Sequence, residues 1–436
     1  MEINKISVSN LFELFNHTIP LNLRQHITIM YGLNGIGKTI ILRMLNGLFN
    51  SDFSLFRTIP FQDFTVEFTD GRSLKLTHYT DQSAKHNSYP KIEYIDAKGA
   101  VANSWELKKL KYPSRLVYDL ADEIPEIIRV GPTTWRSVPT GEMLNPNQIM
   151  DRYEDIMPSS VRVTREPEWL MKIQKSINVR FLDVERLLGV AKGRRPWEEQ
   201  PRRKPSVNVY SDELASNIQK TYTEYASLSQ SLDRSFPHRL LEDNRPIKTT
   251  SKELRHKLDE LEKKRMHLVD AGVLDKETIE EPISIQIRAQ DKNVLSVYLS
   301  DTEKKLRQFD ELARKIDILR TIINSRFKNK AMTVDRKKGF TFTSSNGKSI
   351  RPSDLSSGEQ HEIVMLYELL FKVKSGTLFL IDEPELSLHV GWQMQLVSDL
   401  QEIAELGAFH VLMATHSPQI INKRWDLTVE LKGPKE

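Results

Sequence analysis

A glycine-rich run near the start of the chain has the residue types that hold nucleotide phosphates. Residues 32–39 read Gly-Leu-Asn-Gly-Ile-Gly-Lys-Thr. In such a loop the backbone N–H groups face phosphate oxygens, the lysine adds a positive charge and the threonine ligates Mg²⁺. We therefore predict that the loop binds ATP with Mg²⁺. Its predicted nucleotide-binding residues are Gly32, Asn34, Gly35, Gly37, Lys38 and Thr39.

Two carboxylates follow an apolar run in the last quarter of the chain. The run 378–381 reads Leu-Phe-Leu-Ile and ends on Asp382 and Glu383. At the carboxyl end of a buried strand, Asp382 would lie beside the Mg²⁺ and Glu383 would act as general base or position the attacking water. Such pairs are also common at solvated strand ends, but the phosphate loop favours the functional interpretation.

A serine-glycine turn, Ser356-Ser357-Gly358, precedes a predicted helix. Its hydroxyl and N–H groups form an anion site at the helix N-terminus. The same residues form an N-cap, with Glu359 or Gln360 in the first turn. The two interpretations are compatible, since the cap orients the helix dipole that the γ-phosphate of a second copy would meet.

His416 follows the apolar run 411–414. A single histidine is usually structural, but three phosphate-handling motifs elsewhere favour a place at the same sheet edge. The predicted catalytic residues are thus Lys38, Glu383 and His416, and the predicted metal ligands are Thr39 and Asp382.

The elements that must position these residues alternate between strand and helix. We expect strands at 25–31, 377–382 and 409–415 and helices at 40–49, 358–373 and 390–406. This alternation indicates a parallel sheet covered on both faces. Turn pairs Asp70-Gly71, Lys98-Gly99 and Asn346-Gly347 predict hairpins at 64–76, 92–99 and 340–350. Between them we expect helices at 116–128 and 166–177, a loop at 130–147 and a strand at 179–184.

The middle of the chain has helical periodicity. Apolar residues at helical spacing predict a helix over 214–232, and two heptad runs at 254–268 and 309–323 predict an antiparallel coiled-coil hairpin. Twenty residues of helix extend roughly 30 Å, which is too short for a DNA-bridging arm. The hairpin is either a structural stalk or the carrier of subunit contacts and effector docking.

Composition sets further bounds. The 436 residues include no cysteine, which excludes disulfides, thiol nucleophiles and cysteine-ligated zinc. We expect a cytoplasmic protein, since neither a long apolar run nor a signal peptide is evident. The net charge of +4 does not indicate whole-protein steering toward nucleic acid. The basic stretch 192–204 contains Trp197 and would suit a nucleic-acid backbone or an acidic viral protein, although a solvated loop partly neutralised by Glu198 and Glu199 is favoured.

Together the motifs resemble an ABC-type ATPase head. The resemblance rests on the phosphate loop and on the runs 355–359, 382–385 with Leu388-His389, and 415–418. It points to the branch of chromosome-maintenance, break-repair and OLD-like ATPases, because transporter heads have Ser-Ala-Leu-Asp where residues 385–389 read Glu-Leu-Ser-Leu-His. Residues 357–362 and 417–422 are most similar to the stand-alone AAA-15 ATPases of anti-phage systems such as PARIS and Septu.

The resemblance covers about residues 1–50 and 335–430, and two departures stand out. Ser357 replaces the glycine of many heads. The magnesium-contacting glutamine of the family has no assigned position; Gln62 and Gln148 are only guesses and are not among the predicted site residues.

The resemblance implies an α/β fold, an ABC-type head with mixed and parallel sheets, flanking helices and an antiparallel β subdomain, interrupted by the helical hairpin. The expected division is 1–205 and 333–436 as head segments around an insertion at 206–332. It also implies a head-to-tail homodimer, or a larger oligomer, with ATP between Lys38 of one copy and Ser356 of the other.

Function and partners follow from the same resemblance. No segment has a nuclease carboxylate cluster and there is no room for a Toprim domain after His416, so we expect a nuclease effector in trans. ATP binding and hydrolysis would then drive a sensor and scaffold of an anti-phage complex with a phage-encoded trigger. The alternative is a DNA-repair or chromosome-maintenance ATPase.

Overall fold

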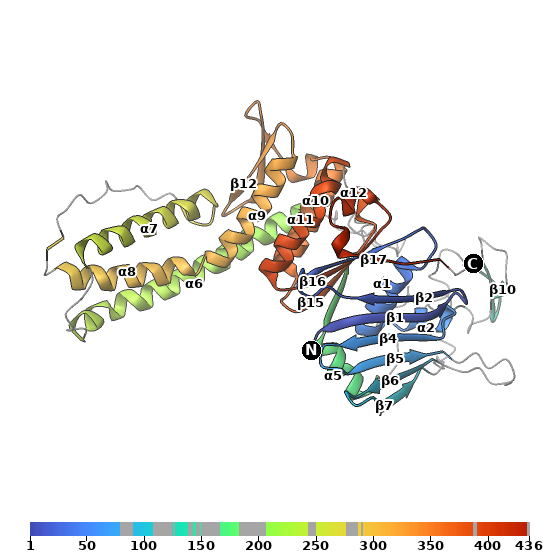
Figure 1. Ribbon diagram of the computed structural model, residues 1–436. Coiled ribbons are helices and arrows are strands. Elements are labelled where there is room, and N and C mark those ends of the chain that lie inside the picture. Colours follow the sequence, from blue (N-terminus) through green and yellow to red (C-terminus); the bar gives the residue numbers. More distant parts are fainter. Residues whose placement is uncertain are drawn as a thin grey trace. The chain divides into compact units, whose positions relative to one another are not determined.

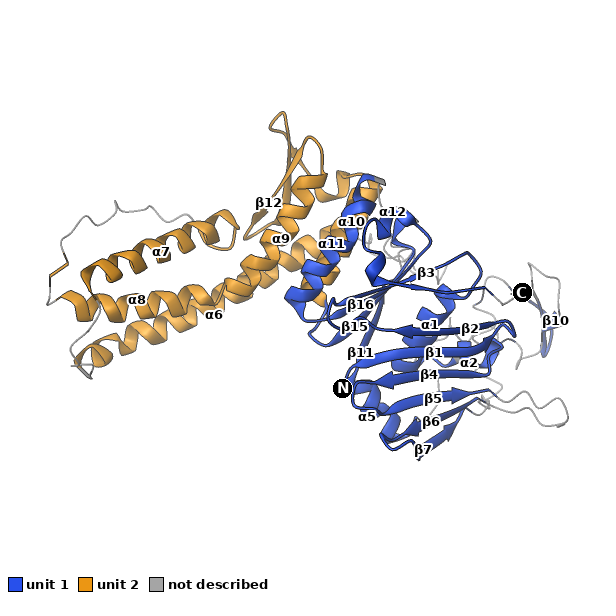
Figure 2. Ribbon diagram, in the orientation of Figure 1, with its two compact units in different colours: residues 1–201, 373–436 blue, residues 202–372 orange. Residues whose placement is uncertain are grey.

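The computed structural model describes residues 1–78, 90–107, 127–137, 166–182, 206–242, 250–275, 291–386 and 390–433, with residues 124, 143–144, 149 and 287–288. Two compact units are present (Figures 1 and 2). Unit 1 comprises residues 1–201 and 373–436, and unit 2 comprises residues 202–372. The division predicted from the sequence, into head segments 1–205 and 333–436 and an insertion at 206–332, was drawn by expected function and stays a prediction.

Unit 1 contains a six-stranded antiparallel sheet in the order β2-β1-β4-β5-β6-β7. Its strands are β1 (Ile3–Leu11), β2 (Phe15–Pro20), β4 (Asp63–Phe68), β5 (Ser73–Thr77), β6 (Lys91–Ile95) and β7 (Val101–Glu106). The alternation of buried and part-exposed residues along β4 leaves one face polar and packs the other in the core. The predicted hairpins at 64–76 and 92–99 are confirmed.

The second sheet of unit 1 is parallel, in the order β11-β15-β16-β3-β17. Its strands are β11 (Asn178–Leu182), β15 (Thr377–Asp382), β16 (His410–Thr415), β3 (Ile27–Tyr31) and β17 (Thr428–Glu430). The predicted strands 25–31, 377–382 and 409–415 are confirmed, and so is the one at 179–184 as far as residue 182, since residues 183 and 184 lie outside the described residues. These strands come from distant parts of the chain.

Helices cover both faces of the parallel sheet. Helix α1 (Lys38–Phe49) contacts β11, β15 and β16, and its apolar residues share one core with Leu380 and Leu412 and with the inner face of the antiparallel sheet. The alternate residues Phe379 and Met413 are buried on the other side, where α11 (Val390–Gly407) contacts β3 and β16. The mixed α/β fold is therefore as predicted. Unit 1 also includes α2 (Ser54–Thr58), α5 (Glu168–Ser176), η6 (Pro384–Leu386), α12 (Pro418–Ile421) and η7 (Trp425–Leu427).

The expected loop at 130–147 was wrong. Strands β8 (Ile127–Gly131), β9 (Thr134–Ser137) and β10 (Met143–Leu144) form a three-stranded antiparallel sheet around the buried Trp135. The helix expected at 116–128 was wrong at its last two residues, which belong to β8. Residues 116–123 of that expected helix lie outside the described residues. Turn residues such as Gly131 and Pro132 mark the hairpin, and its small apolar core supplies the packing.

Unit 2 is largely helical. It contains α6 (Ser206–Glu242), α7 (Ser251–Asp270), α8 (Lys292–Arg307) and α9 (Asp310–Arg326). Helices α6, α7 and α8 lie side by side (Figure 1), with α8 in contact with both of the others. The prediction had no helix at 292–307, and α6 is longer than expected. The second arm of the hairpin therefore begins at Lys292, and α7 pairs with α8 and α9 in turn.

Helix α8, which was not predicted, has a buried polar residue that interrupts the helical spacing of its apolar residues. Asp301 is 4% exposed and accepts hydrogen bonds from the Arg239 guanidinium of α6, with Nη2 to Oδ2 at 2.7 Å. Ion pairs also join α7 to α9, from Lys264 to Asp310 and from His267 to Asp317, at 2.7 Å each.

A three-stranded sheet and the predicted hairpin at 340–350 complete unit 2. The strands are β12 (Lys330–Asp335), β13 (Gly339–Ser344) and β14 (Ser349–Ile350). After η4 (Pro352–Asp354), helix α10 (Ser357–Tyr367) continues into one π-helical turn, η5 (Glu368–Lys372). Among the described residues, no helix is both long enough and apolar enough to cross a membrane.

Candidate functional site

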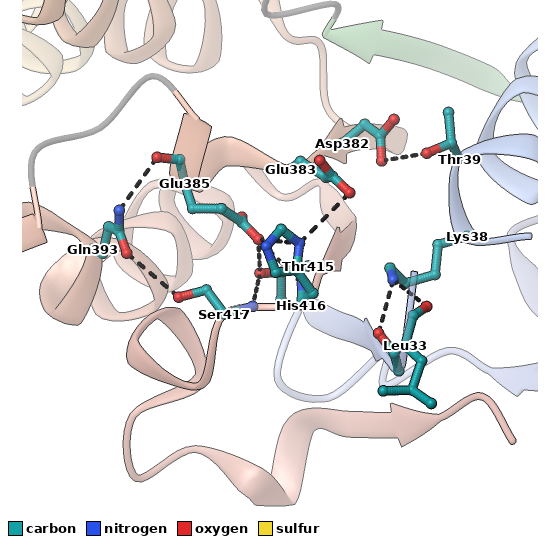
Figure 3. Close-up of polar contacts among 11 residues, drawn as sticks. Leu33, Lys38, Thr39, Asp382, Glu383, Glu385, Gln393, Thr415, His416 and Ser417 are labelled. Atoms are coloured by element: carbon teal, nitrogen blue, oxygen red, sulfur yellow. Dashed lines mark hydrogen bonds and ion pairs between the residues drawn. The ribbon is translucent and has the colours of Figure 1, made fainter. Parts of the chain in front are cut away.

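Three adjacent strands of the parallel sheet end at one edge. β3, β15 and β16 finish at Tyr31, Asp382 and Thr415, and Ala414 pairs with both Met30 and Asp382. The segments that follow these strands hold the phosphate loop, Glu383 and His416 (Figure 3). Carboxyl ends of parallel strands are the usual ligand edge of such sheets. The fold thus brings together residues predicted separately from three parts of the chain.

Close packing explains two glycines of the phosphate loop. A Cβ on Gly32 would lie 2.3 Å from Ile36 Cδ1 and 2.7 Å from the Leu431 carbonyl oxygen. Gly37 has φ of +98° and its Cβ would lie 2.5 Å from Leu11 Cδ2. Gly37 is also the residue before α1 and provides no side-chain cap. The loop therefore leads directly into an α1 N-terminus whose N–H groups suit an anion.

Lys38 is folded back onto the same loop. Its Nζ donates to the carbonyl oxygens of Gly32 at 2.8 Å and Leu33 at 2.9 Å, and the residue is 5% exposed. Burial lowers the pKa of Lys38, while the charges of Glu383 and Asp382 oppose that shift. Asn34 and Gly35 are exposed beside it.

Thr39 and Asp382 are in direct contact. Thr39 Oγ1 donates to Asp382 Oδ1 at 3.2 Å. Burial raises the pKa of Asp382; the Thr39 hydrogen bond opposes the shift, and the neighbouring Glu383 charge adds to it. A desolvated carboxylate beside a threonine hydroxyl is an oxygen donor set that fits Mg²⁺. The residues present therefore fit the magnesium that the phosphate loop implies.

Glu383 has a strained backbone. Its φ is +42°, although it is not a glycine, and its N–H donates to the Ala414 carbonyl at 2.9 Å. A non-glycine residue in this region costs about 1–3 kcal/mol and is typical of functional sites. The conformation sets the carboxylate 3.6 Å from His416 Nδ1.

A second carboxylate, which the prediction did not include, is closer to His416. Glu385 Oε1 lies 3.2 Å from His416 Nδ1 and accepts from the Thr415 hydroxyl at 2.7 Å and from the His416 N–H at 3.1 Å. Gln393 of α11 donates to the Glu385 carbonyl at 3.2 Å. The signal in the sequence was the Glu-Pro-Glu run at 383–385, which gave two carboxylates and only one assigned role.

The serine-glycine turn lies in unit 2 and forms a capping box. Ser356 Oγ accepts from the Glu359 N–H at 3.4 Å, and the Ser356 N–H donates to Glu359 Oε2 at 2.9 Å. Lys330 Nζ donates to both oxygens of Glu359 at 2.8 and 2.7 Å. Burial works against ionisation of Glu359, yet Lys330 and Ser356 hold its pKa below the usual value. Ser356 and Ser357 are exposed at the N-terminus of α10.

Of the remaining positions named from the sequence, the structure describes Gln62 alone. Gln62 is joined by backbone hydrogen bonds to Ser9 and His78 at the start of β4. Gln148, the basic stretch 192–204 and Leu388-His389 lie outside the described residues.

Comparison with known proteins decides the family. The family described as "AAA domain, putative AbiEii toxin, Type IV TA system" matches residues 193–422, more than half of the chain. The chain belongs to this AAA domain family. The matched AAA region contains Ser356, Asp382 and His416, while the phosphate loop lies ahead of it.

Other similarities are narrower. The UvrABC system protein A of Clostridium acetobutylicum is 30% identical over 154 residues, which is 35% of this chain and 14% of that protein. The chain thus spans a small fraction of the length of this curated relative.

Solved structures of SMC heads also match, at low identity. The Smc head domain of Pyrococcus furiosus, bound to the C-terminal domain of ScpA, is 13% identical with a TM-score of 0.34, covering 96% of this chain and 91% of that one. The SMC head domain from Thermotoga maritima is 9% identical with a TM-score of 0.35, covering 99% and 95%.

Proposed function

We propose that the chain binds and hydrolyses ATP at the carboxyl edge of the parallel sheet. The observation that carries this is the contact between Thr39 and Asp382, which joins the phosphate loop to the two-carboxylate motif. Family membership supports an AAA-type ATPase domain.

The proposed roles follow from position. Lys38 and the N–H groups at the start of α1 would bind the phosphates. Thr39 and Asp382 would hold Mg²⁺, which when bound neutralises phosphate charge. Glu383, whose carboxylate stands at the strand end, would accept a proton from the attacking water or orient it, and His416 would contact the terminal phosphate.

Two variants test this assignment. Lys38→Ala removes the ammonium group, so ATP affinity should fall by about a hundredfold, the worth of one or two charged hydrogen bonds. Glu383→Gln keeps the size of the side chain but not its basicity, so kcat should fall by about 10²–10⁴-fold with ATP affinity retained. Fluorescent-ATP titration and phosphate release measure the two effects.

A surface variant provides the control. Glu67 lies on the polar face of β4 and pairs with Lys5, away from this edge, so Glu67→Gln should match the parent protein. Equal ATP affinity in the parent and in Lys38→Ala would refute the assignment of the loop.

We propose further that this ATPase is the sensor and scaffold of a bacterial anti-phage complex, dimerising head-to-tail around ATP and controlling a nuclease effector in trans. The family description, which names a putative toxin of a toxin–antitoxin system, supports a defence role. The exposed Ser356 and Ser357 at the α10 N-terminus support a trans phosphate contact.

A phage challenge tests this role. Cells carrying the native operon should lose protection with Lys38→Ala and keep it with Glu67→Gln. Unchanged plaque counts for the parent operon and an empty vector would contradict the defence role without touching the ATPase assignment.

The similarity to UvrABC system protein A favours a second candidate, a DNA-repair or chromosome-maintenance ATPase. That function predicts that duplex DNA stimulates ATP hydrolysis. Hydrolysis that is unaffected by DNA, in a protein that protects against phage, would support the first candidate.

A further inference from the structure

Glu385 is buried at the candidate site without a use in the proposed mechanism. Its side chain is 7% exposed, and it follows the two-carboxylate motif in η6. Three groups meet one of its oxygens, Oε1: the Thr415 hydroxyl, the His416 N–H and His416 Nδ1. The other oxygen, Oε2, is buried and has no hydrogen-bond partner among the residues that the structure describes.

Burying a carboxylate in this way is costly unless a cationic or strong donor group compensates. The Thr415 hydroxyl and one backbone N–H are neutral donors. The imidazole of His416, whose side chain is 41% exposed, is the one ring that faces Glu385 in the described part of the site. A packing role alone would be served by a neutral residue.

Two carboxylates face the same ring nitrogen. Glu385 Oε1 is 3.2 Å and Glu383 Oε1 is 3.6 Å from His416 Nδ1 (Figure 3). One N–H can make one strong hydrogen bond, so the carboxylates compete for it. The closer partner is Glu385, and the additional bonds from Thr415 and the His416 backbone fix it in place.

We propose that Glu385 is a positioning residue that accepts a hydrogen bond from the Nδ1–H of His416 and so leaves Glu383 free to act on water. With its Nδ1 held in this way, the imidazolium form of the ring would donate its Nε2–H to a phosphate oxygen. This inference rests on the proposed ATPase function. It follows the general rule that the partner of one ring nitrogen determines what the other can do.

The arrangement around Glu385 also fixes the turn that carries His416. The Ser417 N–H donates to Thr415 Oγ1 at 3.0 Å, and the Ser417 hydroxyl donates to Gln393 at 3.4 Å. Residues 415–417 are therefore held to η6 and α11 by side chains. A displacement of Glu385 would therefore move Thr415, whose hydroxyl it holds, and with it the neighbouring His416.

A double-mutant cycle on the whole protein tests the proposal. Glu385→Gln keeps an acceptor oxygen for Thr415 and the backbone, but loses the charge that attracts Nδ1–H. We expect kcat to fall by about tenfold or more, as for other partners that orient catalytic groups, with the KM for ATP changed less than about twofold. Because Glu385 acts through His416, Glu385→Gln/His416→Ala should be no slower than His416→Ala.

A merely structural role gives a different result. The losses of Glu385→Gln and His416→Ala would then multiply in the double variant, and that outcome would overturn the proposal, as would a His416→Ala protein with the parent kcat. If Glu385→Gln does not fold, Thr415→Val removes one anchor of the carboxylate and should show the same non-additivity with His416→Ala; multiplicative losses there overturn the proposal equally.

The outcomes separate this inference from the function on which it rests. If the parent protein does not hydrolyse ATP, both the ATPase function and the role of Glu385 are refuted. If the parent hydrolyses ATP, Glu383→Gln loses that activity and Glu385→Gln keeps it, only the role of Glu385 is refuted. Glu67→Gln again serves as the charge-matched control and should keep the parent kcat.

Discussion

Single residues at the candidate site show which contacts local pattern can predict. The position of the phosphate loop and the contact partner of Thr39 were expected from the sequence, because a short motif at the end of a strand sets each of them. The contacts of Glu385 were not expected, since they depend on a turn thirty residues later that returns beside it. The positive φ of Glu383 was equally hidden, because sequence alone does not record backbone strain.

His17 supports the phosphate loop from the antiparallel sheet. Its Nε2 lies 2.9 Å from the Ile36 carbonyl, the residue is 4% exposed, and its ring stacks on Phe15. Burial lowers the pKa of His17, and the hydrogen bond to Ile36 offsets part of that shift. The neutral ring therefore donates to the loop.

A pH-dependent stability follows from this burial. Since the folded pKa of His17 is below the unfolded value of about 6.5, its stabilisation is complete above that value and is lost as pH falls toward the folded pKa. His17→Gln, which keeps an N–H donor, should give a smaller drop in Tm between about pH 7.5 and about pH 5 than the parent protein.

Other, half-buried histidines limit the size of the effect. Burial also lowers the pKa of His78, His361 and His410, so part of the drop should remain. The exposed His256 provides the control, and His256→Gln should keep the full pH dependence. Parallel Tm curves for His17→Gln and the parent would contradict the prediction.

At the scale of elements, helices with clean apolar periods were predictable and the others were not. The strands around the site have continuous apolar runs, and α1 and α11 have helical spacing. Helix α8 buries Asp301 against Arg239, so a polar residue occupies a position where the period requires an apolar one. The sheet β8–β10 depends on a small core around Trp135, which turn residues in its sequence obscure.

Helices α9 and α10 are joined by a fully buried ion pair. Arg326 is 2% exposed and Glu362 is 0% exposed, and the guanidinium contacts the carboxylate. Burial lowers the pKa of Arg326 to about 10, which still leaves it charged at neutral pH. Each charge is therefore shielded from solvent and depends on the other for compensation.

Breaking this pair should cost more than removing it. Either Arg326→Met or Glu362→Leu alone leaves one buried charge, so we expect a loss of about 3–5 kcal/mol in unfolding free energy. The double variant should recover most of that loss, since apolar side chains can replace both. Urea unfolding monitored by circular dichroism measures all three, and equal losses in single and double variants would contradict the prediction.

At the scale of the whole molecule, the α/β class was predictable because strand and helix alternate around the motifs. The two units were less so. The unit boundary at residue 372 falls between α10 and β15, because α10 packs with α6 and α9. Those contacts come from distant segments that no local pattern reveals.

Assembly can be tested at the α10 N-terminus. A negative charge at the first helical position is favourable to the helix but would repel a phosphate from another copy. With ATP, Glu383→Gln should double in mass by light scattering, and Ser357→Glu in that background should remain at the mass of one chain. Lys38→Ala should not dimerise either.

The matched control is a serine in the same unit. Ser349 is exposed on β14, so Ser349→Glu in the Glu383→Gln background should still dimerise. A Ser357→Glu protein that dimerises with ATP as the control does would remove the serine-glycine turn from the interface.

The strand order of the parallel sheet bears on how the protein is made. Ile27 of β3 pairs with Val411, and Ile29 pairs with Thr428, so both neighbours of the strand before the phosphate loop are synthesised hundreds of residues after it. Contacts of such sequence separation slow folding. Until those neighbours are synthesised, β3 is unpaired and its apolar side chains are exposed. During this period the nascent chain can aggregate or bind chaperones.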